Sequence, residues 1–202
     1  MSEVAAILLA AGFSRRMGAR NKLLLPVGGV PMIRHMVNVY GAISERPVLV
    51  VTGHAAKDIE AALSGSFART VFNPDYAQGQ ATSVVCGLRE VDPATDVLIG
   101  LGDQPLLTVK DLHALLTMHR AADTSRISIP VYQQQRGNPI VVPASLCSHV
   151  LADPKSPGCK KFTRTHPEYV QFQTLPSRGF YTDIDTPEAY EALRQSNQEA
   201  NV

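Results

Sequence analysis

The amino-acid sequence predicts an α/β protein: a single-domain, Rossmann-like three-layer α/β/α sandwich built around a mostly parallel sheet. Short apolar runs of strand length end at turn residues, which is typical of strands buried on both faces in a parallel sheet. These runs alternate with segments whose apolar residues recur at helical spacing, as in layered α/β folds. A length of 202 residues suits one domain with a substantial core.

The first half of the chain supplies four of the expected strands. They are the run from Val4 that breaks at Gly12, then Val48–Val51, a stretch around Thr70–Phe72, and Val97–Leu101. Helices are expected at Met32–Ile43, near Ile59–Leu63, over Gly79–Glu90, and after the capping residue Thr108. The carboxyl ends of parallel strands meet at one sheet edge, so the loops that follow these strands should line one cleft. Those loops lie at Gly12, Thr52, Asn73 and Asp103.

The second half of the chain is less regular. Strands are expected at Ile127–Val131, Ile140–Val142 and Tyr169–Thr174, a helix at Ser145–Leu151, and a loop at Asp153–Gly158. A final helix carries Tyr190 and Leu193 on its apolar side, with Asp185 or Thr186 as its cap and Pro187 in its first turn. The tail from Gln195 to Val202 is expected to be frayed.

Charge and cysteine content exclude several functional classes. The chain has 19 Lys and Arg against 18 Asp and Glu, a net charge of +1, so the basic surplus of a nucleic-acid binder is missing. No apolar run is long enough to cross a bilayer, and the first residues lack the features of a signal peptide. Cys86, Cys147 and Cys159 are widely spaced, which favours free thiols in a reducing cytoplasm.

The loop after the first apolar run has the features of a phosphate-binding site. Small residues around Gly12 expose backbone N–H groups, and Arg15, Arg16 and Lys22 add positive charge. Neither the P-loop pattern nor the Gly-x-Gly-x-x-Gly pattern of dinucleotide-binding proteins is present. We interpret the loop as a nucleoside triphosphate site, and a plain surface connection with scattered charges is the alternative.

Acidic side chains at two places are candidates for holding a divalent cation. Asp103 follows a predicted strand, while Asp183 and Asp185 are two apart and share a face if the segment is extended. Mg²⁺ prefers one or two carboxylates, with phosphate and water completing its shell. Turn formation by Asp103 and helix capping by the later pair are the alternative interpretations.

Taken together, the motifs resemble a known family over almost the full chain. The opening signature is Ala10-Ala11-Gly12-x-Ser14-x-Arg16-Met17-Gly18, followed by Lys22. Further matches are Val51-Thr-Gly53, Asn73-Pro-x-x-x-x-Gly79-x-x-x-Ser83, Gly87-Leu88, Gly102-Asp-Gln-Pro105, Arg136-Gly-Asn-Pro139 and Asp183-Ile-Asp-Thr-Pro187. In order and spacing the set is similar to the MobA-like nucleotidyltransferases, a group with the fold of the nucleotide-diphospho-sugar transferases. It most resembles their molybdenum cofactor cytidylyltransferase branch.

The resemblance implies a role for individual residues. It implies one domain over 1–202, with a nucleotide-binding half at 1–105, an acceptor-binding half at 106–194, and the tail. The implied nucleotide-binding residues are Leu9, Ala10, Ala11, Gly12, Ser14, Arg15, Arg16, Lys22, Thr52, Gly53, Asn73, Gly79 and Ser83. The implied catalytic residues are Arg16, Lys22 and Asp103, and the implied metal ligands are Asp103, Asp185 and, more weakly, Asp183. On the acceptor side it implies Gln104, Arg136, Gly137 and Asn138. Mg²⁺ is the expected metal, and Mn²⁺ also suits these oxygen ligands.

The implied reaction is CMP transfer from CTP to the phosphate of molybdopterin cofactor, with release of pyrophosphate. The expected partners are these small molecules and a molybdoenzyme or its chaperone, with neither nucleic acid nor membrane. GMP transfer, or cytidylyl transfer to a sugar or polyol phosphate, are alternatives within the same chemistry. A non-catalytic chaperone that carries the cofactor is an alternative of another class.

His54 follows a strand end without a nucleophile partner and is interpreted as a solvated histidine.

One segment departs from the cytidylyltransferase pattern. Relatives in that branch usually have an acidic Gly-Asp-x-Gly-Ala-Arg-like segment, where this chain has Ser156-Pro157-Gly158-Cys159-Lys160-Lys161. The basic character is retained and the acid is lost. The departure therefore bears on the acceptor more than on the reaction.

The residue at position 11 predicts the choice of nucleotide. The guanylyl branch typically has Leu-Ala-Gly-Gly in the opening loop, while this chain has Leu9-Ala-Ala-Gly12. The methyl group of Ala11 would narrow the pocket against a purine, so Ala11→Gly should shift the kcat/KM ratio toward GTP by about tenfold. Steady-state kinetics with both nucleotides measure that ratio, and an unchanged preference for CTP would refute the steric explanation.

Overall fold

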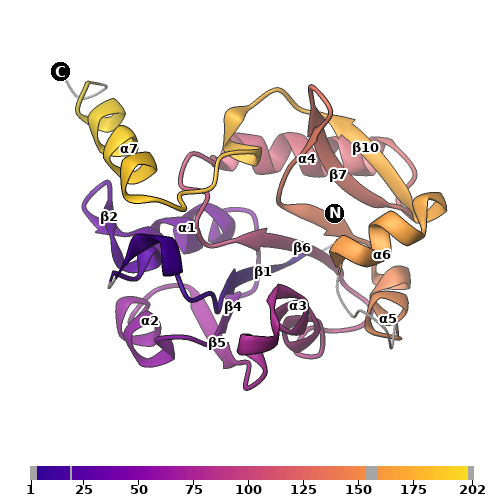
Figure 1. The fold of residues 1–202 in the computed structure, drawn as a ribbon. Coiled ribbons are helices and arrows are strands. Elements are labelled where there is room, and N and C mark those ends of the chain that lie inside the picture. Colours follow the sequence, from indigo (N-terminus) through magenta and orange to yellow (C-terminus); the bar gives the residue numbers. More distant parts are fainter. Residues whose placement is uncertain (1–3, 19, 153–158, 200–202) are drawn as a thin grey trace.

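The computed structural model describes residues 4–18, 20–152 and 159–199 of the chain. Its centre is a mixed, mostly parallel sheet in the order β10-β7-β9-β6-β1-β4-β5, with β8 paired to β7 (Figure 1). The strands are β1 (Val4–Ala10), β4 (Val48–Thr52), β5 (Ala68–Phe72), β6 (Asp96–Leu101), β7 (Ile127–Tyr132), β8 (Gln135–Arg136), β9 (Ile140–Val142) and β10 (Val170–Thr174). The pairs β1–β4, β1–β6, β4–β5 and β7–β10 are parallel, while β9 runs antiparallel to β6 and β7. The predicted fold class is confirmed.

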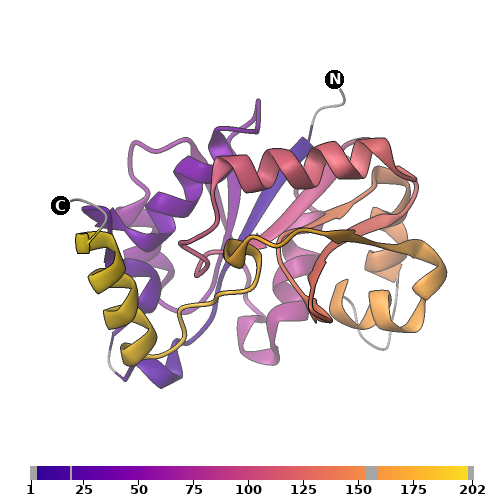
Figure 2. The ribbon, with the colours of Figure 1, turned by 90° about the horizontal axis from the view of Figure 1, so that it is seen from above.

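Helices cover both faces of the sheet (Figures 1 and 2). They are α1 (Met32–Gly41), α2 (Ala56–Ala62), α3 (Gln80–Leu88), α4 (Val109–Ala121), α5 (Ala144–Ala152), α6 (Cys159–Thr165) and α7 (Pro187–Glu199). In Figure 2, α4 crosses one face while α3 and the α5–α6 region lie on the other. None of the helices in the described part of the chain is long and apolar enough to span a membrane.

Strand β1 shows why the sequence has continuous apolar runs. Every residue from Val4 to Ala10 is buried. Ala6 and Leu8 belong to the core under α1 and α4, while Ile7 and Leu9 belong to the core under α3 and α5. Because successive side chains of a strand point to opposite faces, a strand covered by helices on both faces is expected to be apolar along its length, as β1 is.

The capping predictions are resolved by hydrogen bonds. Thr108 caps α4, since its hydroxyl accepts from the Asp111 N–H while the Asp111 carboxylate accepts from the Thr108 N–H. At α7 the hydroxyl of Thr186 accepts from the Ala189 N–H at 3.3 Å, so Thr186 is the cap. The carboxylate of Asp185 is thereby left for other contacts.

Three local features differ from the sequence-based expectation. A small hairpin, β2 (Pro26–Val27) and β3 (Val30–Pro31), was not predicted, although Gly28 and Gly29 both have the positive φ of a two-residue hairpin turn. Helix α6 was not predicted, because its apolar side is a short run with Cys159 and Phe162. Helix α7 continues as far as Glu199, into the segment expected to be frayed from Gln195, and the Glu191–Arg194 ion pair lies in the turn before that segment. The loop predicted at Asp153–Gly158 lies outside the described residues.

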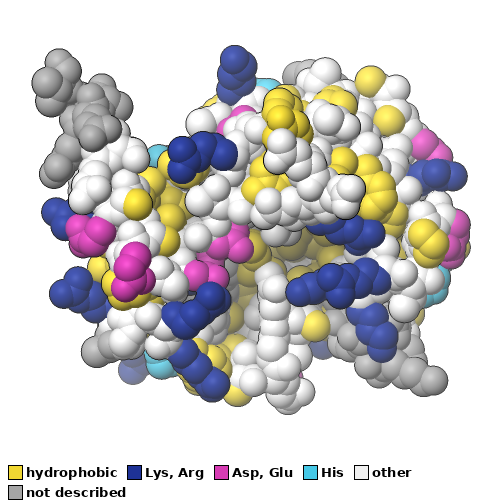
Figure 3. All heavy atoms as spheres, turned by 45° about the horizontal axis from the view of Figure 1, so that its top comes forward, with side chains coloured by type: hydrophobic (Ala, Val, Ile, Leu, Met, Phe, Trp, Pro, Cys, Tyr) yellow, Lys and Arg dark blue, Asp and Glu magenta, His cyan; other side chains and the backbone are white. Residues whose placement is uncertain are grey.

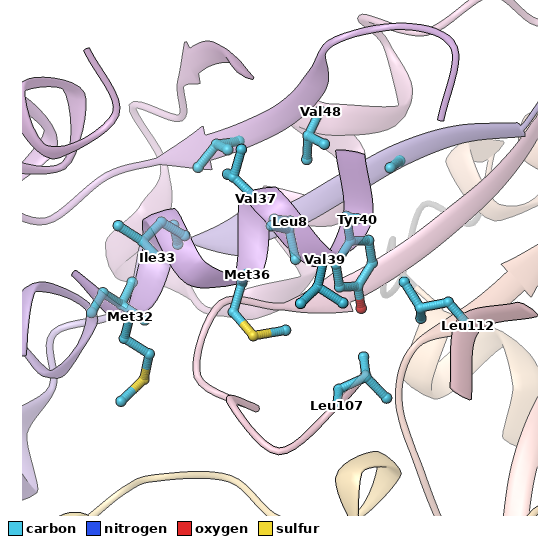
Figure 4. Close-up of a cluster of buried hydrophobic side chains, with 14 of the residues drawn as sticks. Leu8, Met32, Ile33, Met36, Val37, Val39, Tyr40, Val48, Leu107 and Leu112 are labelled. Carbon is cyan, nitrogen blue, oxygen red and sulfur yellow. The ribbon is translucent and has the colours of Figure 1, made fainter. Parts of the chain in front are cut away.

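Tyr40 fills the space between the sheet and α4. Along α1 the buried side chains of Ile33, Met36, Val37 and Tyr40 face the core at helical spacing (Figure 4). The hydroxyl of Tyr40 lies against Gly100 of β6, where a Cβ would come within 1.8 Å of the oxygen. The glycine in the middle of an otherwise apolar strand is therefore required by the packing of Tyr40.

The order of the strands creates a crevice at one edge of the sheet. Strand β1 pairs with β4 on one side and with β6 on the other, so the chain runs outward from β1 to β4 and β5 and then returns to the opposite side of β1. Ligands of open α/β sheets bind beyond the carboxyl ends of the strands at such a switch point. The loops after β1, β4, β5 and β6 all begin at this edge, as the sequence predicted.

The two buried tyrosines in this core give a matched test of stability. The Tyr40 hydroxyl has no hydrogen-bond partner among the described residues, whereas the Tyr190 hydroxyl donates to the Pro26 carbonyl at 2.8 Å. Tyr40→Phe should therefore leave the free energy of unfolding unchanged or raise it by about 1 kcal/mol, while Tyr190→Phe should lower it by about 1 kcal/mol. Urea unfolding followed by circular dichroism measures both, and equal losses would contradict the expectation.

Candidate functional site

A cavity of about 550 Å³ opens at the carboxyl edge of the sheet. The face in Figure 3 shows a hollow with hydrophobic side chains on its floor and both acidic and basic side chains around it. The cavity is lined by Leu9, Ala10, Ala11, Gly12, Phe13, Ser14, Arg15, Arg16, Lys22, Leu23, Tyr76, Ala77, Gly79, Gln80, Ser83, Leu101, Asp103, Asp183 and Asp185. Most of the residues predicted to bind nucleotide or metal are therefore brought together.

The loop after β1 is held in an irregular conformation by its own residues. Ser14 adopts the left-handed region at φ 51°, and a short 3-10 helix (Arg15–Met17) follows. The carboxamide oxygen of Asn21 accepts from the Leu23 N–H at 3.0 Å, which caps a second 3-10 turn (Lys22–Leu24). Met17 and Leu23 are buried and anchor the loop, and Arg15, Arg16 and Lys22 line the cavity.

Four charged side chains form one network at the cavity wall. The Lys22 ammonium donates to the carboxylate of Asp103 and, at 2.5 Å, to the carboxylate of Asp185. The Arg16 guanidinium donates to the second oxygen of Asp185 at 2.6 Å. The residues are far apart in the sequence, and the Ile184 N–H bond to the Asp103 carbonyl at 2.9 Å brings the two carboxylates together.

The network controls the ionisation of its members. Burial alone lowers the pKa of Lys22, but the adjacent carboxylates of Asp103 and Asp185 outweigh burial and raise this pKa above its usual range. Burial alone raises the pKa of Asp185, but Lys22 and Arg16 outweigh it and lower this pKa. Both groups are therefore charged at neutral pH, and the charges of the four side chains cancel.

Asp183 has a different environment from Asp185. The Gln104 carboxamide, which is 1% exposed, donates from Nε2 to Asp183 at 2.8 Å and to the Phe180 carbonyl at 3.2 Å. Burial, together with the negative charge of Asp103, raises the pKa of Asp183. Gln104 lines neither this cavity nor the larger one beside it. The structure thus places Gln104 beneath the site, where it orients Asp183.

The carboxylates fit a hard divalent cation with few protein ligands. Asp103 and Asp185 converge on one point, which the Lys22 ammonium occupies, and one oxygen of Asp103 is buried without a hydrogen-bond partner among the described residues. Within those same residues no cluster of three or more His, Cys, Asp or Glu could hold a metal. Two carboxylates with open positions suit Mg²⁺, whose remaining ligands are water and phosphate.

Two of the predicted nucleotide contacts lie under the cavity wall. Thr52 is fully buried and donates to the Val71 carbonyl at 3.2 Å. Asn73 is 2% exposed and donates to the hydroxyls of Thr82 and Ser83 at 2.9 and 3.0 Å, which fixes the start of α3. These residues support the wall, whereas Gly79 and Ser83 face the cavity.

Aromatic residues at the cavity mouth were not singled out from the sequence. Phe13 and Tyr76 both line the cavity, with ring centroids 5.3 Å apart, and His54 lies 5.1 Å from Phe13. Gly53 lies beneath them: a Cβ there would come within 2.5 Å of Tyr76 and 2.8 Å of the Ala11 methyl. Gly53 is thus a packing requirement for the wall.

A second cavity of about 970 Å³ adjoins the first. The two share Leu9, Gln80, Leu101 and Asp183. The predicted acceptor residues Arg136, Gly137 and Asn138 line it, over a floor that includes Val84, Ile99, Ile129 and Ile140. Lys160, Lys161 and Arg164 of α6 also line it and were not among the predicted site residues. Arg164 is four residues after Lys160 and three after Lys161, so each lysine would have been placed beside Arg164 had this helix been recognised.

Comparison with known proteins gives a consistent set of similarities. The family model described as a MobA-like NTP transferase domain matches residues 6–170. Nicotine blue oxidoreductase of Paenarthrobacter nicotinovorans is 29% identical over 193 residues, covering 92% of this chain and 93% of that protein. The bifunctional protein GlmU of Brevibacillus brevis is 33% identical over 120 residues, or 59% of this chain, and the match spans only 26% of GlmU.

A solved structure extends the likeness to the whole fold. A nucleotidyl transferase from Methanothermobacter superposes with a TM-score of 0.81 at 25% identity, covering 99% of this chain and all of that one. The similarity includes the elements that form both cavities.

Two glycines at the carboxyl edge of the sheet, Gly53 in a packed position and Gly12 in an open one, allow the packing role of Gly53 to be tested. Gly53→Ala should lower the free energy of unfolding by about 1–3 kcal/mol, because its methyl group displaces Tyr76 or Ala11. Gly12→Ala is the control, since nothing lies within 4 Å of its Cβ, and it should change stability by less than about 0.5 kcal/mol. Thermal unfolding measures the difference, and equal effects of the two substitutions would argue against a packing role for Gly53.

Proposed function

Because the chain belongs to the MobA-like NTP transferase family, we propose that this nucleotidyltransferase moves CMP from CTP to the phosphate of molybdopterin cofactor, releasing pyrophosphate. The observation that carries the proposal is the pair of adjoining cavities with the charged network of Lys22, Asp103 and Asp185 beside their junction. The smaller cavity would take the nucleotide and the larger one the acceptor. Residues 1–105 would then supply most of the nucleotide side, with residues 106–194 supplying the acceptor side and the late carboxylates.

The reaction joins two anions, so charge compensation is its main requirement. Lys22 and Arg16 would neutralise the phosphates on the leaving side, and backbone N–H groups around Gly12 would hold the triphosphate. Asp103 and Asp185 would hold Mg²⁺, or Mn²⁺, with Asp183 as a weaker candidate because Gln104 occupies one of its oxygens. When bound, the metal would supply Lewis-acid stabilisation of charge at the α-phosphate.

The chain's own residues would act by positioning. The acceptor phosphate is already largely ionised at neutral pH, so its oxygen can attack the α-phosphorus in line without a general base. Pyrophosphate leaves in the same step, and no covalent enzyme intermediate forms. Arg136, Gly137 and Asn138 would position the acceptor from the second cavity.

The proposed choice of CTP rests on Ala11. Ala11 lines the nucleotide cavity and packs toward Gly53, which supports a pocket narrowed in favour of a pyrimidine. GTP, or a sugar or polyol phosphate as acceptor, would use the same charged network. A carrier without catalysis is disfavoured, because Arg16, Lys22 and Asp103 are all present and in contact with their partners or with the cavity. The product would pass to a molybdoenzyme or its chaperone in the cytoplasm.

A second candidate function comes from the relative that matches almost the full chain. That protein is named an oxidoreductase, so an oxidation–reduction reaction on this scaffold is the second candidate. The four-charge network of Arg16, Lys22, Asp103 and Asp185 has no evident task in hydride transfer. It therefore favours nucleotidyl transfer as the first proposal.

Pyrophosphate release tests the proposed function. The enzyme is incubated in Mg²⁺ with CTP, GTP, ATP or UTP, each with and without molybdenum-loaded molybdopterin. Release is expected only with CTP and the cofactor together. Asp103→Asn, which keeps the shape of the side chain and removes its charge, should lower kcat at least about a hundredfold.

The same samples discriminate the alternatives. Release with GTP in place of CTP would keep the reaction and refute the pyrimidine preference. Tight CTP binding without release would point to another phosphorylated acceptor, and oxidation of NADH or NADPH without nucleotide transfer would favour the oxidoreductase. Lys57→Met, at an exposed position that lines neither cavity, serves as the control and should match the wild type.

A further inference from the structure

The Lys22 ammonium is placed between the two carboxylates proposed to hold the metal. It contacts Asp103 and lies 2.5 Å from Asp185. Its side chain is 13% exposed, compared with 69% for Arg16, the other cation of the network. The ammonium is thus an enclosed cation at the centre of the network, whereas Arg16 contacts Asp185 from the solvent side.

The carboxylates do not depend on Lys22 to stay together. The backbone of Asp103 accepts from the Ile184 N–H at 2.9 Å, and the Gly102 N–H donates to the Leu9 carbonyl at 3.1 Å. These bonds fix the end of β6 against β1 and against the segment that leads into α7. Removal of the ammonium would therefore leave both acids in place around the same point.

The balance of charges makes the position between Asp103 and Asp185 unfavourable for a metal ion that arrives without phosphate. Asp103 and Asp185 are already neutralised by Lys22 and Arg16, so a divalent cation arriving alone would meet two compensated acids and the ammonium between them. A triphosphate arriving alone could draw Lys22 away only by leaving the enclosed carboxylate of Asp103 without a cation and Asp185 with Arg16 alone. When both arrive together, neither cost remains, because the phosphates form ion pairs with the Lys22 ammonium and the metal binds the carboxylates of Asp103 and Asp185.

From this geometry we infer that, in the protein without ligands, the Lys22 ammonium occupies the position that the divalent cation takes when it binds. The metal and the triphosphate therefore bind cooperatively, and each raises the affinity of the protein for the other. The inference rests on the assignment of Asp103 and Asp185 as metal ligands in the proposed function. It does not depend on which base or acceptor the enzyme uses. Because binding linkage is reciprocal, the same factor must appear in both affinities.

Metal binding without nucleotide tests the inference. The free Mn²⁺ signal in electron paramagnetic resonance gives the Mn²⁺ Kd of the protein alone. Lys22→Met removes the charge and keeps much of the side-chain length, so it should lower this Kd at least about tenfold. It should also weaken the binding of inorganic triphosphate, because the released cation is absent.

Two control variants distinguish the effect of the position of Lys22 from the effect of removing one positive charge. Arg16→Met removes the other cation of the network but leaves Lys22 between the acids, so it should change the Mn²⁺ Kd by less than about threefold. Lys57→Met makes the same chemical change on the exposed surface of α2 and should have no effect. An unchanged Mn²⁺ Kd in Lys22→Met, or an equal gain in all three variants, would overturn the inference.

A crystallographic experiment on the wild-type protein tests the same inference without a variant. Crystals are soaked with MnCl₂ at about a tenth of the Mn²⁺ Kd measured for the wild-type protein, either alone or with inorganic triphosphate. An anomalous manganese peak between Asp103 and Asp185 is expected only with the triphosphate, together with displacement of Lys22. A peak without triphosphate and with Lys22 unmoved would refute the inference even if the variant does not fold. Neither readout requires turnover, so a failure of the pyrophosphate assay leaves this test intact.

Discussion

The burial of β1 on both faces is the constraint on which the rest of the molecule depends. This central strand carries only apolar side chains between its two helical layers, so the polar groups at its end are supplied by the loop after Ala10. Pairing of β1 with β4 and β6 then fixes which other loops share that edge. Sheet topology therefore brings the cations after β1 and the acid after β6 together. No further structural element is needed to place these charged side chains side by side.

Much of the fold could be predicted from the sequence because the main signals are periodic. Apolar runs such as Val48–Val51 and the helical spacing from Met32 onward report burial directly, and the structure confirms them. Short elements give no such signal. The hairpin at Gly28 and Gly29 and helix α6 each have too few residues for a period to be recognised. The continuation of α7 depends on local propensity, which is a weak signal in any sequence.

The candidate site shows a similar division between residues that face the cavities and residues that support them. Motif spacing predicted Asp103, Lys22, Asn73 and Gln104 as site residues alike, but it does not indicate how deeply each side chain is buried. In the structure Asn73 and Gln104 are buried and act through the residues that they orient, Ser83 and Asp183. Tyr76 shows the converse, since a tyrosine in a turn has no periodic signal that marks it as part of a cavity wall.

The link between Asp103 and Ile184 also has a consequence for how the molecule is made. Chains emerge from the ribosome N-terminus first, and their early parts can fold while later parts are still being synthesised. The loop after β1 and the end of β6 precede residue 105, but Asp185 and the Ile184 N–H arrive only with the last segment before α7. A nascent chain therefore contains Lys22 and Asp103 long before it contains the second acid. The two acids proposed to hold the metal are therefore both present only after residue 185 has been synthesised.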